Sequence, residues 1–598
     1  MKYAKEACSE CKRRKIKVWP LSVRKRKACS NSLSVDSVAA RNHVAANKPP
    51  ERIHAEIAEP SVEDLGLGNM PISDHPADIL NALGTFPFTS AQQHELGLDT
   101  PLTRLGSVWS RLHAEPKLGL LLKCGFDELE FFYPCIDRTD FYNRLSKILP
   151  RSNVIYEGGT CEIPQAEYRA LAAMVCRLLS IAVFLGAGAD SHEQGDGHYL
   201  KASWSWHLEC QKLLSDSSAY DCPSFDIIRA YLLEVSYMTM VQRRRDASKA
   251  IAIAVDLAFC MGLNNEEAWS TNTTREKEHL RLLWWTVFHL DRRVGLMVHR
   301  PYLIRDADFA VAEMTAQSRD VYCDFSPSAG NFTEKDLASP LTEDWFDYFL
   351  FSVKWSKIAT QAWDKFFTLR SSKSFDSDNL EVIDALLLKL KHDLPSSLTW
   401  DAKRLPLYIA SGECDRAFRL QLIIFERINM LRLIVHSRCS QYAGAASTNC
   451  EHSTSVHTLG ITENMATTVI DSIVDYLTAR NGARPWTTYC SMLLAEATTL
   501  VTPVVKRQHE ATHTTYEVIA SIERAKECLQ ALVAFKFHAV DLACQRLSFI
   551  LDGVNPGQAM NTMGVTLGHG TLYDDYETID MFGFAWEDCP GDLEDIIF

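Results

Sequence analysis

Cys8 and Cys11 stand three positions apart near the N-terminus, directly before a run of cations. Two thiolates at this spacing can hold one side of a tetrahedral zinc site, because the metal favours the deprotonated sulfurs that bind it. Cations on a short helix anchored by such a metal would meet DNA phosphates or a guanine edge. The pattern therefore predicts a zinc-held head that binds double-stranded DNA. Its predicted DNA contacts are Lys12, Arg13, Arg14, Lys15 and Lys17.

The stretch "ACSECKRRKIKV" (residues 7–18) resembles the first half of the fungal binuclear zinc cluster, a DNA-binding motif built on six cysteines. That resemblance implies six ligand positions, of which three keep cysteine here. Three thiolates do not support a binuclear cluster, whereas a single zinc could take water or His43 as its fourth ligand. The implied zinc ligands are Cys8, Cys11 and Cys29, and the other three positions hold Val18, Ser32 and Ala39.

Two explanations of the replaced positions stay open. Every valine codon begins with GT, the usual intron donor, so an intron retained from Val18 onward could have replaced genuine cysteines. Alternatively the cluster has decayed, since the spacing between Cys29 and Ala39 is preserved. Without metal the head should be largely disordered, because such small domains have no core of their own. Its cations would then bind nucleic acid loosely.

Charge separates the head from the rest of the chain. Residues 1–29 contain eleven Lys and Arg against two Glu, although the whole chain of 598 residues has a net charge of −14. A basic arm on an acidic body indicates a polyanion-binding segment. The runs "KRRKIK" and "RKRK" are also typical of a nuclear localisation signal, so both interpretations predict the nucleus.

The eighteen cysteines include a single C-x-x-C pair, which favours a reducing, intracellular compartment over a disulfide framework. The most apolar stretch, residues 171–189, contains Arg177, a charge that is costly in lipid. It therefore predicts a buried helix rather than a membrane span. No secretory signal is recognisable, because the basic N-terminus has no apolar segment behind it.

Apolar residues recur three and four positions apart from residue 127 onward, and alternating strand patterns are nearly absent. This periodicity predicts an all-α body. Helix starts are predicted at Ser224 and at Thr273 or Thr274. The clearest apolar stripe consists of Leu280, Leu283, Trp284, Val287 and Phe288.

Composition divides the chain into four predicted parts. Residues 1–40 form the basic head, and the proline-rich residues 41–126 form a flexible linker with short local helices at most. Residues 127–560 form the helical body, in which the polar stretch 441–460 is predicted to be a surface loop. Residues 561–598 form an acidic tail.

Three stretches of the body resemble the helical regulatory domain of the same fungal transcription factor family. They are "FFYPCIDRTDF" (131–141), "ASKAIAIAVDLAFCMGLNNE" (247–266) and "RLLWWTVFHLDRRVGLMVHRPYLIRDADFAV" (281–311). The resemblance implies a large all-α regulatory domain. One departure is His299, where the family usually has glycine before Arg-Pro.

Physical chemistry of the third stretch points to structure rather than catalysis. Asp291 with Arg292 or Arg293 favours a partly buried ion pair over an acid–base couple. Pro301 ends the helix, because proline lacks the backbone N–H. The chain has no H-E-x-x-H, G-x-S-x-G, P-loop or dinucleotide-binding glycine motif, so we do not expect an enzyme.

The tail from Tyr573 to Phe598 contains nine acidic residues and no Lys or Arg, with aromatic side chains between the charges. Acidic repulsion keeps such a segment solvated while its aromatic groups can fold into the groove of a partner. This composition is typical of an activation segment, and an inert acidic tail is the alternative. The predicted activation residues are Phe582, Phe584 and Trp586.

These observations predict a nuclear transcription factor that regulates RNA polymerase II transcription in a fungus, for a pathway-specific gene set. Its predicted partners are double-stranded DNA, the transcription machinery or a co-activator, and a second copy through the helical domain. The alternative is a co-regulator of the same family that has lost direct DNA binding and acts through another factor. A helical enzyme or ligand-binding protein with an incidental basic arm is the third interpretation.

Overall fold

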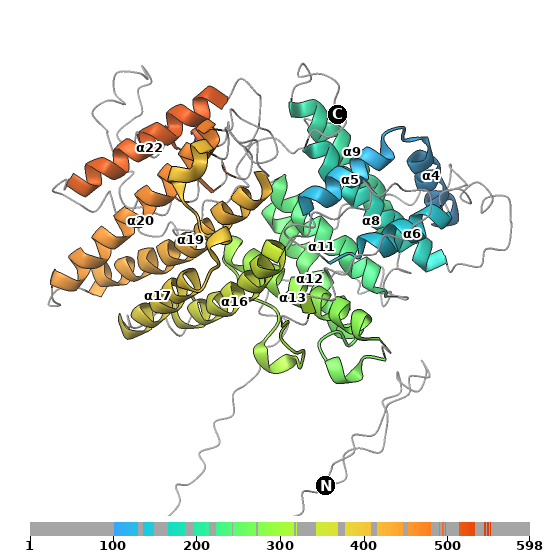
Figure 1. Ribbon diagram of the computed structural model, residues 1–598, viewed down its shortest axis with the longest axis horizontal. Helices are drawn as coiled ribbons and strands as arrows, with labels where there is room; N and C mark the ends of the chain where they lie inside the picture. The colour runs from blue at the N-terminus through green and yellow to red at the C-terminus, as the bar shows by residue number, and fades with distance from the viewer. Residues whose placement is uncertain are drawn as a thin grey trace, which may run out of the picture. The chain divides into compact units, whose positions relative to one another are not determined.

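The computed structural model describes a set of helices, all within the compact unit formed by residues 91–598 (Figure 1). Among the described residues there is no strand, and a single parallel bridge pairs Asn265 with Ala310. The predicted all-α class is confirmed for the body. The described residues are 101–129, 135–148, 165–185, 196–214, 223–241, 243–270, 273–315, 318–319, 343–368, 377–407, 415–446, 452–479, 490, 493–494, 497, 513–532, 543–545, 547–548 and 551.

The helices occur in the following order along the chain. They are α4 (Pro101–Ala114), α5 (Leu118–Leu129), α6 (Arg138–Ile148), α8 (Gln165–Phe184), α9 (Asp196–Leu214), α11 (Phe225–Met240), α12 (Arg244–Cys260), α13 (Thr274–Met297), α16 (Glu343–Phe366), α17 (Ser377–His392), α19 (Asp415–Ala446), α20 (His452–Ala479) and α22 (His513–Leu532). Short 3₁₀ turns lie between them: η3 (Glu266–Ala268), η4 (Asp306–Asp308), η6 (Ser396–Leu398) and η7 (Ala402–Arg404).

The first apolar core is built by helices α4 to α13, in which α8 packs against α5, α9 and α11 (Figure 1). Helix α8 is buried on all sides, which explains why its sequence reads as a continuous apolar run. Its one central charge, Arg177, is fully buried, and its guanidinium lies 2.9 Å from the carboxylate of Glu234 on α11. The stretch 171–189 is thus a core helix, as predicted for its described part. Among the described residues, no helix is both long and apolar enough to cross a bilayer.

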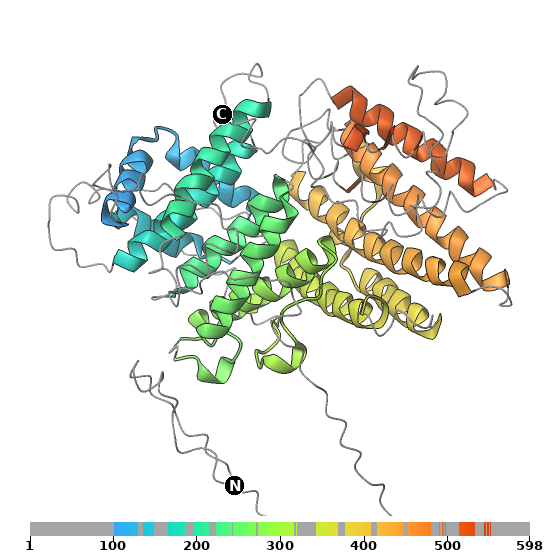
Figure 2. The same cartoon turned by 180° about the vertical axis from the view of Figure 1, so that it is seen from behind.

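The second apolar core contains α17, α19, α20 and α22, with α19 beside α20 and α20 beside α22 in both views (Figures 1 and 2). Helix α16 belongs to both cores, because opposite faces of it carry large apolar side chains. Its residues in the first core are Trp345, Phe346, Phe349 and Val353. Those in the second core are Tyr348, Phe351, Trp355, Ile358, Ala359, Ala362 and Phe366.

The predicted helix starts and the predicted apolar stripe are confirmed. The Ser224 side chain accepts a hydrogen bond from the backbone N–H of Ile227 at the start of α11, and Thr273 does the same for Glu276 at the start of α13. All five residues of the stripe on α13 are buried in the first core.

Two sequence-based boundaries differ from the structure. Helix α4 and most of α5 lie within residues 41–126, the stretch predicted as linker, and Trp109 and Leu122 on them are buried in the first core. Because apolar side chains here find partners far along the chain, the helical part already includes residue 101. The predicted surface loop 441–460 is also largely wrong, since α19 extends to Ala446 and α20 begins at His452.

Candidate functional site at the C-terminal end of α13

Asp291 and Arg292 on α13 form a buried ion pair, with 3.0 Å between a carboxylate oxygen of Asp291 and Nη1 of Arg292. The Asp291 carboxylate also accepts hydrogen bonds from the backbone N–H groups of Leu303 and Ile304, at 2.9–3.0 Å. Burial raises the pKa of Asp291, and the charge of Arg292 opposes this shift. The predicted ion pair is therefore confirmed, and it attaches the chain after α13 to the helix itself.

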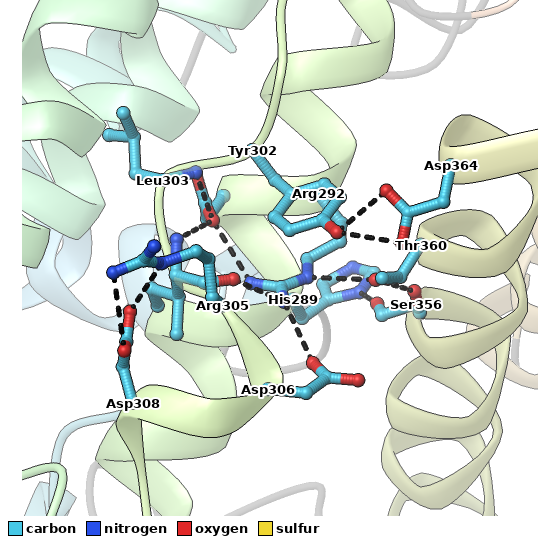
Figure 3. Close-up of polar contacts among 12 residues, drawn as sticks. His289, Arg292, Tyr302, Leu303, Arg305, Asp306, Asp308, Ser356, Thr360 and Asp364 are labelled. Atoms are coloured by element: carbon cyan, nitrogen blue, oxygen red, sulfur yellow. Dashed lines mark hydrogen bonds and ion pairs between the residues drawn. The ribbon is translucent and has the colours of Figure 1, made fainter. Parts of the chain in front are cut away.

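The guanidinium of Arg292 connects three segments (Figure 3). It donates to the carbonyl oxygen of Ile304 at 2.7 Å and to Oγ1 of Thr360 on α16 at 3.1 Å. Its Cζ lies over the rings of Phe288 and Tyr302, 3.6 and 4.6 Å from the two ring centroids. Burial lowers its pKa. Arg292 thus holds α13, the following turn and α16 together.

A tight turn reverses the chain directly after α13. The N–H of Arg300 donates to the carbonyl of Gly295, and the N–H of His299 donates to that of Leu296, which is a Schellman ending. His299 occupies the left-handed position of this turn with φ of 53°. Glycine is favoured there, which gives a physical reason for the glycine of the related family. A Cβ on Gly295 would lie 3.1 Å from the carbonyl oxygen of Arg300, so the chain can cross the helix closely here.

Helix α16 faces this site with four polar side chains spaced four residues apart, which therefore lie on one side of the helix. They are Ser352, Ser356, Thr360 and Asp364, here called the polar column. Figure 3 shows the last three of them. Each one meets a side chain from elsewhere in the unit. The partners, in the same order, are Arg427 at 2.9 Å, His289 at 2.7 Å, Arg292 at 3.1 Å and Tyr302 at 2.8 Å.

The hydrogen bonds of the column determine the protonation of His289. The hydroxyl of Ser356 donates to the carbonyl of Ser352 at 2.8 Å, so it must accept from Nδ1 of His289. Burial and the charge of Arg427 hold the pKa of His289 well below its usual range. His289 is therefore a neutral imidazole with its proton on Nδ1. At the outer end of the column, burial and Asp364 raise the pKa of Tyr302 to about 12.

A surface hollow with an internal volume of about 10 Å³ lies beside the turn. Small-molecule sites usually measure roughly 300–1,000 Å³, so this hollow is too small for a typical effector. The hollow is lined by Arg292, Gly295, Leu296, Arg300, Tyr302, Ala359 and Trp363. The arrangement positions a turn between two cores. Its serine–histidine pair, Ser356 and His289, is buried, and the Nδ1 that faces the hydroxyl carries the proton, so this nitrogen cannot act as a base toward Ser356.

The sequence-predicted functional residues lie outside the described part of the chain. This applies to the zinc ligands Cys8, Cys11 and Cys29, to the cations from Lys12 to Lys17, and to the tail residues Phe582, Phe584 and Trp586. Within the described residues, no group of three or more His, Cys, Asp or Glu could hold a metal ion. The polar column was missed from sequence, although its four-residue spacing of polar side chains in an aromatic helix was a readable signal.

Residues 126–354 match the sequence profile of the fungal specific transcription factor domain. This match begins in α5 and ends within α16, so it covers most of the first core together with α13 and its turn. The family is one of transcription factor domains and not of enzymes, in agreement with the absence of catalytic motifs.

A curated relative is the cutinase transcription factor 1 beta of Fusarium vanettenii, which is 25% identical over 111 residues. The matched stretch is 19% of this chain, and the chain spans 12% of the length of that relative. The likeness is therefore local. Residues 126–354, which include the buried Asp291–Arg292 pair and the turn that it holds, are thus similar to the fungal specific transcription factor domain.

Proposed function

We propose that this chain is a nuclear transcription factor of a fungus that regulates a pathway-specific set of genes read by RNA polymerase II. The observation that supports this proposal most strongly is the transcription factor domain over residues 126–354. The local likeness to a relative named as a cutinase transcription factor supports the same class of function.

In the proposed mechanism the basic head binds double-stranded DNA through the cations between Lys12 and Lys17. A zinc ion, held by Cys8, Cys11 and Cys29, would order this head when bound. The acidic tail recruits the transcription machinery or a co-activator through Phe582, Phe584 and Trp586, which makes the protein an activator. The helical body between them gates this recruitment, and a homodimer would pair through the same body.

A second candidate function is supported by the replaced ligand positions Val18, Ser32 and Ala39. With three of six thiols missing, the protein could act as a co-regulator that reaches DNA only through another factor. Both candidates use the tail in the same way, and they differ only in the head.

Zinc analysis and DNA binding of the full-length protein separate the two candidates. We expect about one zinc per chain and selective binding to a subset of genomic fragments, both lost in a variant with Cys8, Cys11 and Cys29 replaced by alanine. The control is Cys260→Ala, because Cys260 is exposed on α12 and lies far from the head in sequence. Metal-free protein that binds random and genomic DNA equally would reject the DNA-reading proposal and favour the co-regulator.

The activation step is tested with the full chain tethered to an unrelated DNA-binding domain upstream of a reporter gene. Replacing Phe582, Phe584 and Trp586 by alanine should reduce reporter output at least about ten-fold, since aromatic anchors carry most of such binding energy. The matched control is Tyr516→Ala, an exposed aromatic residue on α22. Unchanged output in the triple variant would contradict an activating tail.

A further inference from the structure

Three of the large apolar side chains most exposed to solvent lie close together in sequence. Val382 and Leu388 on α17 are 47% and 43% exposed, and Leu407, just after η7, is 69% exposed. The opposite side of α17 is buried in the second core through Leu380, Ile383, Leu387 and Leu390. Helix α17 thus has a well-packed inner face and an outer face that is apolar without a covering element among the described residues.

The end of α17 and the stretch around η7 meet at one ring. The Lys391 ammonium lies 5.9 Å from the centroid of Phe425, and the Trp400 ring lies 6.2 Å from the same Phe425. The C-terminal end of α17 and the segment that leads into η7 therefore both approach Phe425 on α19. We define the lysine–leucine surface as Val382, Ala385, Leu388, Lys389, Lys403, Arg404 and Leu407, all of which are exposed.

Basic side chains are concentrated at the C-terminal end of α17 and in η7. Lys389, Lys391 and His392 stand in the last turn of α17, and Lys403 and Arg404 stand in η7. The nearby acids are Asp393 and Asp401, and the remaining acids of the outer face, Asp378 and Glu381, lie at the other end of α17. An apolar strip with a basic end fits an acidic segment that contains large apolar side chains.

We propose that the acidic tail, residues 573–598, docks on the lysine–leucine surface of its own chain. Its nine acidic residues and its lack of any Lys or Arg complement the basic end, while Phe582, Phe584 and Trp586 supply apolar groups for the strip. Leu388 and Leu407 are the expected contacts of these rings.

Chain length permits this contact. Leu551 is a member of the second core, the same core into which α17 packs. The connecting residues 552–572 reach up to about 70 Å when extended and about 25 Å on average as a flexible chain. A tether of this length maintains an effective concentration on the order of millimolar at nearby sites, so even weak docking is populated.

Docking would make the helical body compete with recruitment partners for the tail. The aromatic residues that contact the surface are those that the proposed function assigns to recruitment, so a partner would have to displace the body first. This consequence rests on the proposed function, whereas the docking itself does not.

Hydrogen–deuterium exchange of the full-length protein tests the contact directly. We expect amides between about residues 578 and 590 to exchange at least about ten-fold more slowly than in the free peptide 573–598. The variant L388E/K389E places two negative charges on the exposed face of α17, and it should abolish this protection. The matched control is L120E/K147E, because Leu120 is 56% exposed on α5 and Lys147 is an exposed residue in the last turn of α6.

Both variants change exposed side chains, and equal thermal unfolding midpoints would establish that each is folded. Tail protection that survives L388E/K389E, or a tail that exchanges like the free peptide, overturns the proposal. Protection that weakens on dilution overturns it too, because the occupant would then be the tail of a second copy. The exchange measurement uses no transcription readout, so its failure is distinct from failure of the reporter experiment.

Discussion

The two cores differ in the hydrogen bonds that they give to a buried carboxyl group. In the first core, Asp291 accepts hydrogen bonds from two backbone N–H groups and from Arg292. In the second core, Glu426 on α19 is 1% exposed, and neither carboxyl oxygen has a hydrogen-bond partner among the described residues. Burial raises the pKa of both groups, but only for Asp291 does an arginine oppose the shift.

A buried carboxyl group can therefore have two different effects on stability. The paired acid costs desolvation energy but fixes the turn after α13, which the backbone alone would not hold. Glu426 has no hydrogen-bond partner among the described residues, so burial favours its protonated form and makes its charged form costly to stability. We expect the first core to lose stability when its acid is removed and the second core to gain it.

Removing Asp291 should have the largest effect. The variant D291A leaves Arg292 buried without its counter-charge, and such losses cost about 3–5 kcal/mol in unfolding free energy. Urea unfolding of the full-length protein measures the loss. The double variant D291L/R292M should recover part of it, because neither charge is then buried. A loss below about 1 kcal/mol for D291A would remove the contrast between the two cores.

Replacing Glu426 should raise the unfolding free energy, the opposite of the effect expected for Asp291. The variant E426M fills a similar volume without a polar group, and we expect it to raise the unfolding free energy at about pH 7 by about 1–3 kcal/mol. Because the folded pKa is raised, the carboxyl contributes stability below the unfolded pKa of about 4.3, and this contribution is lost as the pH rises toward the folded pKa.

Urea unfolding at about pH 5 and about pH 7 therefore checks the direction in which the stability contribution of Glu426 changes with pH. The wild-type protein should lose stability between these values relative to E426M. The exposed residue Glu523 on α22 offers a control, since E523Q should leave both values unchanged. Greater stability of the wild type at pH 7 would mean that Glu426 has a favourable role.

The close packing of the first core can be tested at two glycines of one helix. A Cβ on Gly125 of α5 would lie 2.9 Å from the carbonyl oxygen of Leu178 on α8, whereas a Cβ on Gly119 would meet no atom within 4 Å. We expect G125A to lower the unfolding free energy by about 1–3 kcal/mol. G119A should raise it by up to about 1 kcal/mol, because alanine favours helices. Equal effects would show that α5 and α8 do not pack closely.

The smallest expected effect concerns the turn that Asp291 fixes. H299G removes the steric cost of a side chain at φ of 53°, and we expect a gain of about 0.5–1 kcal/mol after the entropic cost of glycine. H299A retains the cost and should bring no gain. A loss of stability in H299G would show that contacts of the imidazole outweigh the strain.

Much of the first core could be predicted from periodicity. The stripe on α13, the caps Ser224 and Thr273, and the core helix around Arg177 all followed from local spacing, because an amphipathic helix records its buried face in its own sequence. The sequence did not predict that the helical body begins as early as α4. Prolines nearby suggested a linker, and only distant partners bury Trp109.

The amino-acid sequence by itself determined the helical class, the starts of α11 and α13, and the charged pair within the third family-like stretch. Only the tertiary structure decided that Asp291 binds the backbone of Leu303 and Ile304 and that α16 contributes to both cores. It also decided that Glu426 has no hydrogen-bond partner among the described residues. The reason is physical: helix periodicity depends on neighbours within one turn, whereas these contacts join residues from separate elements, and their register depends on how whole helices pack.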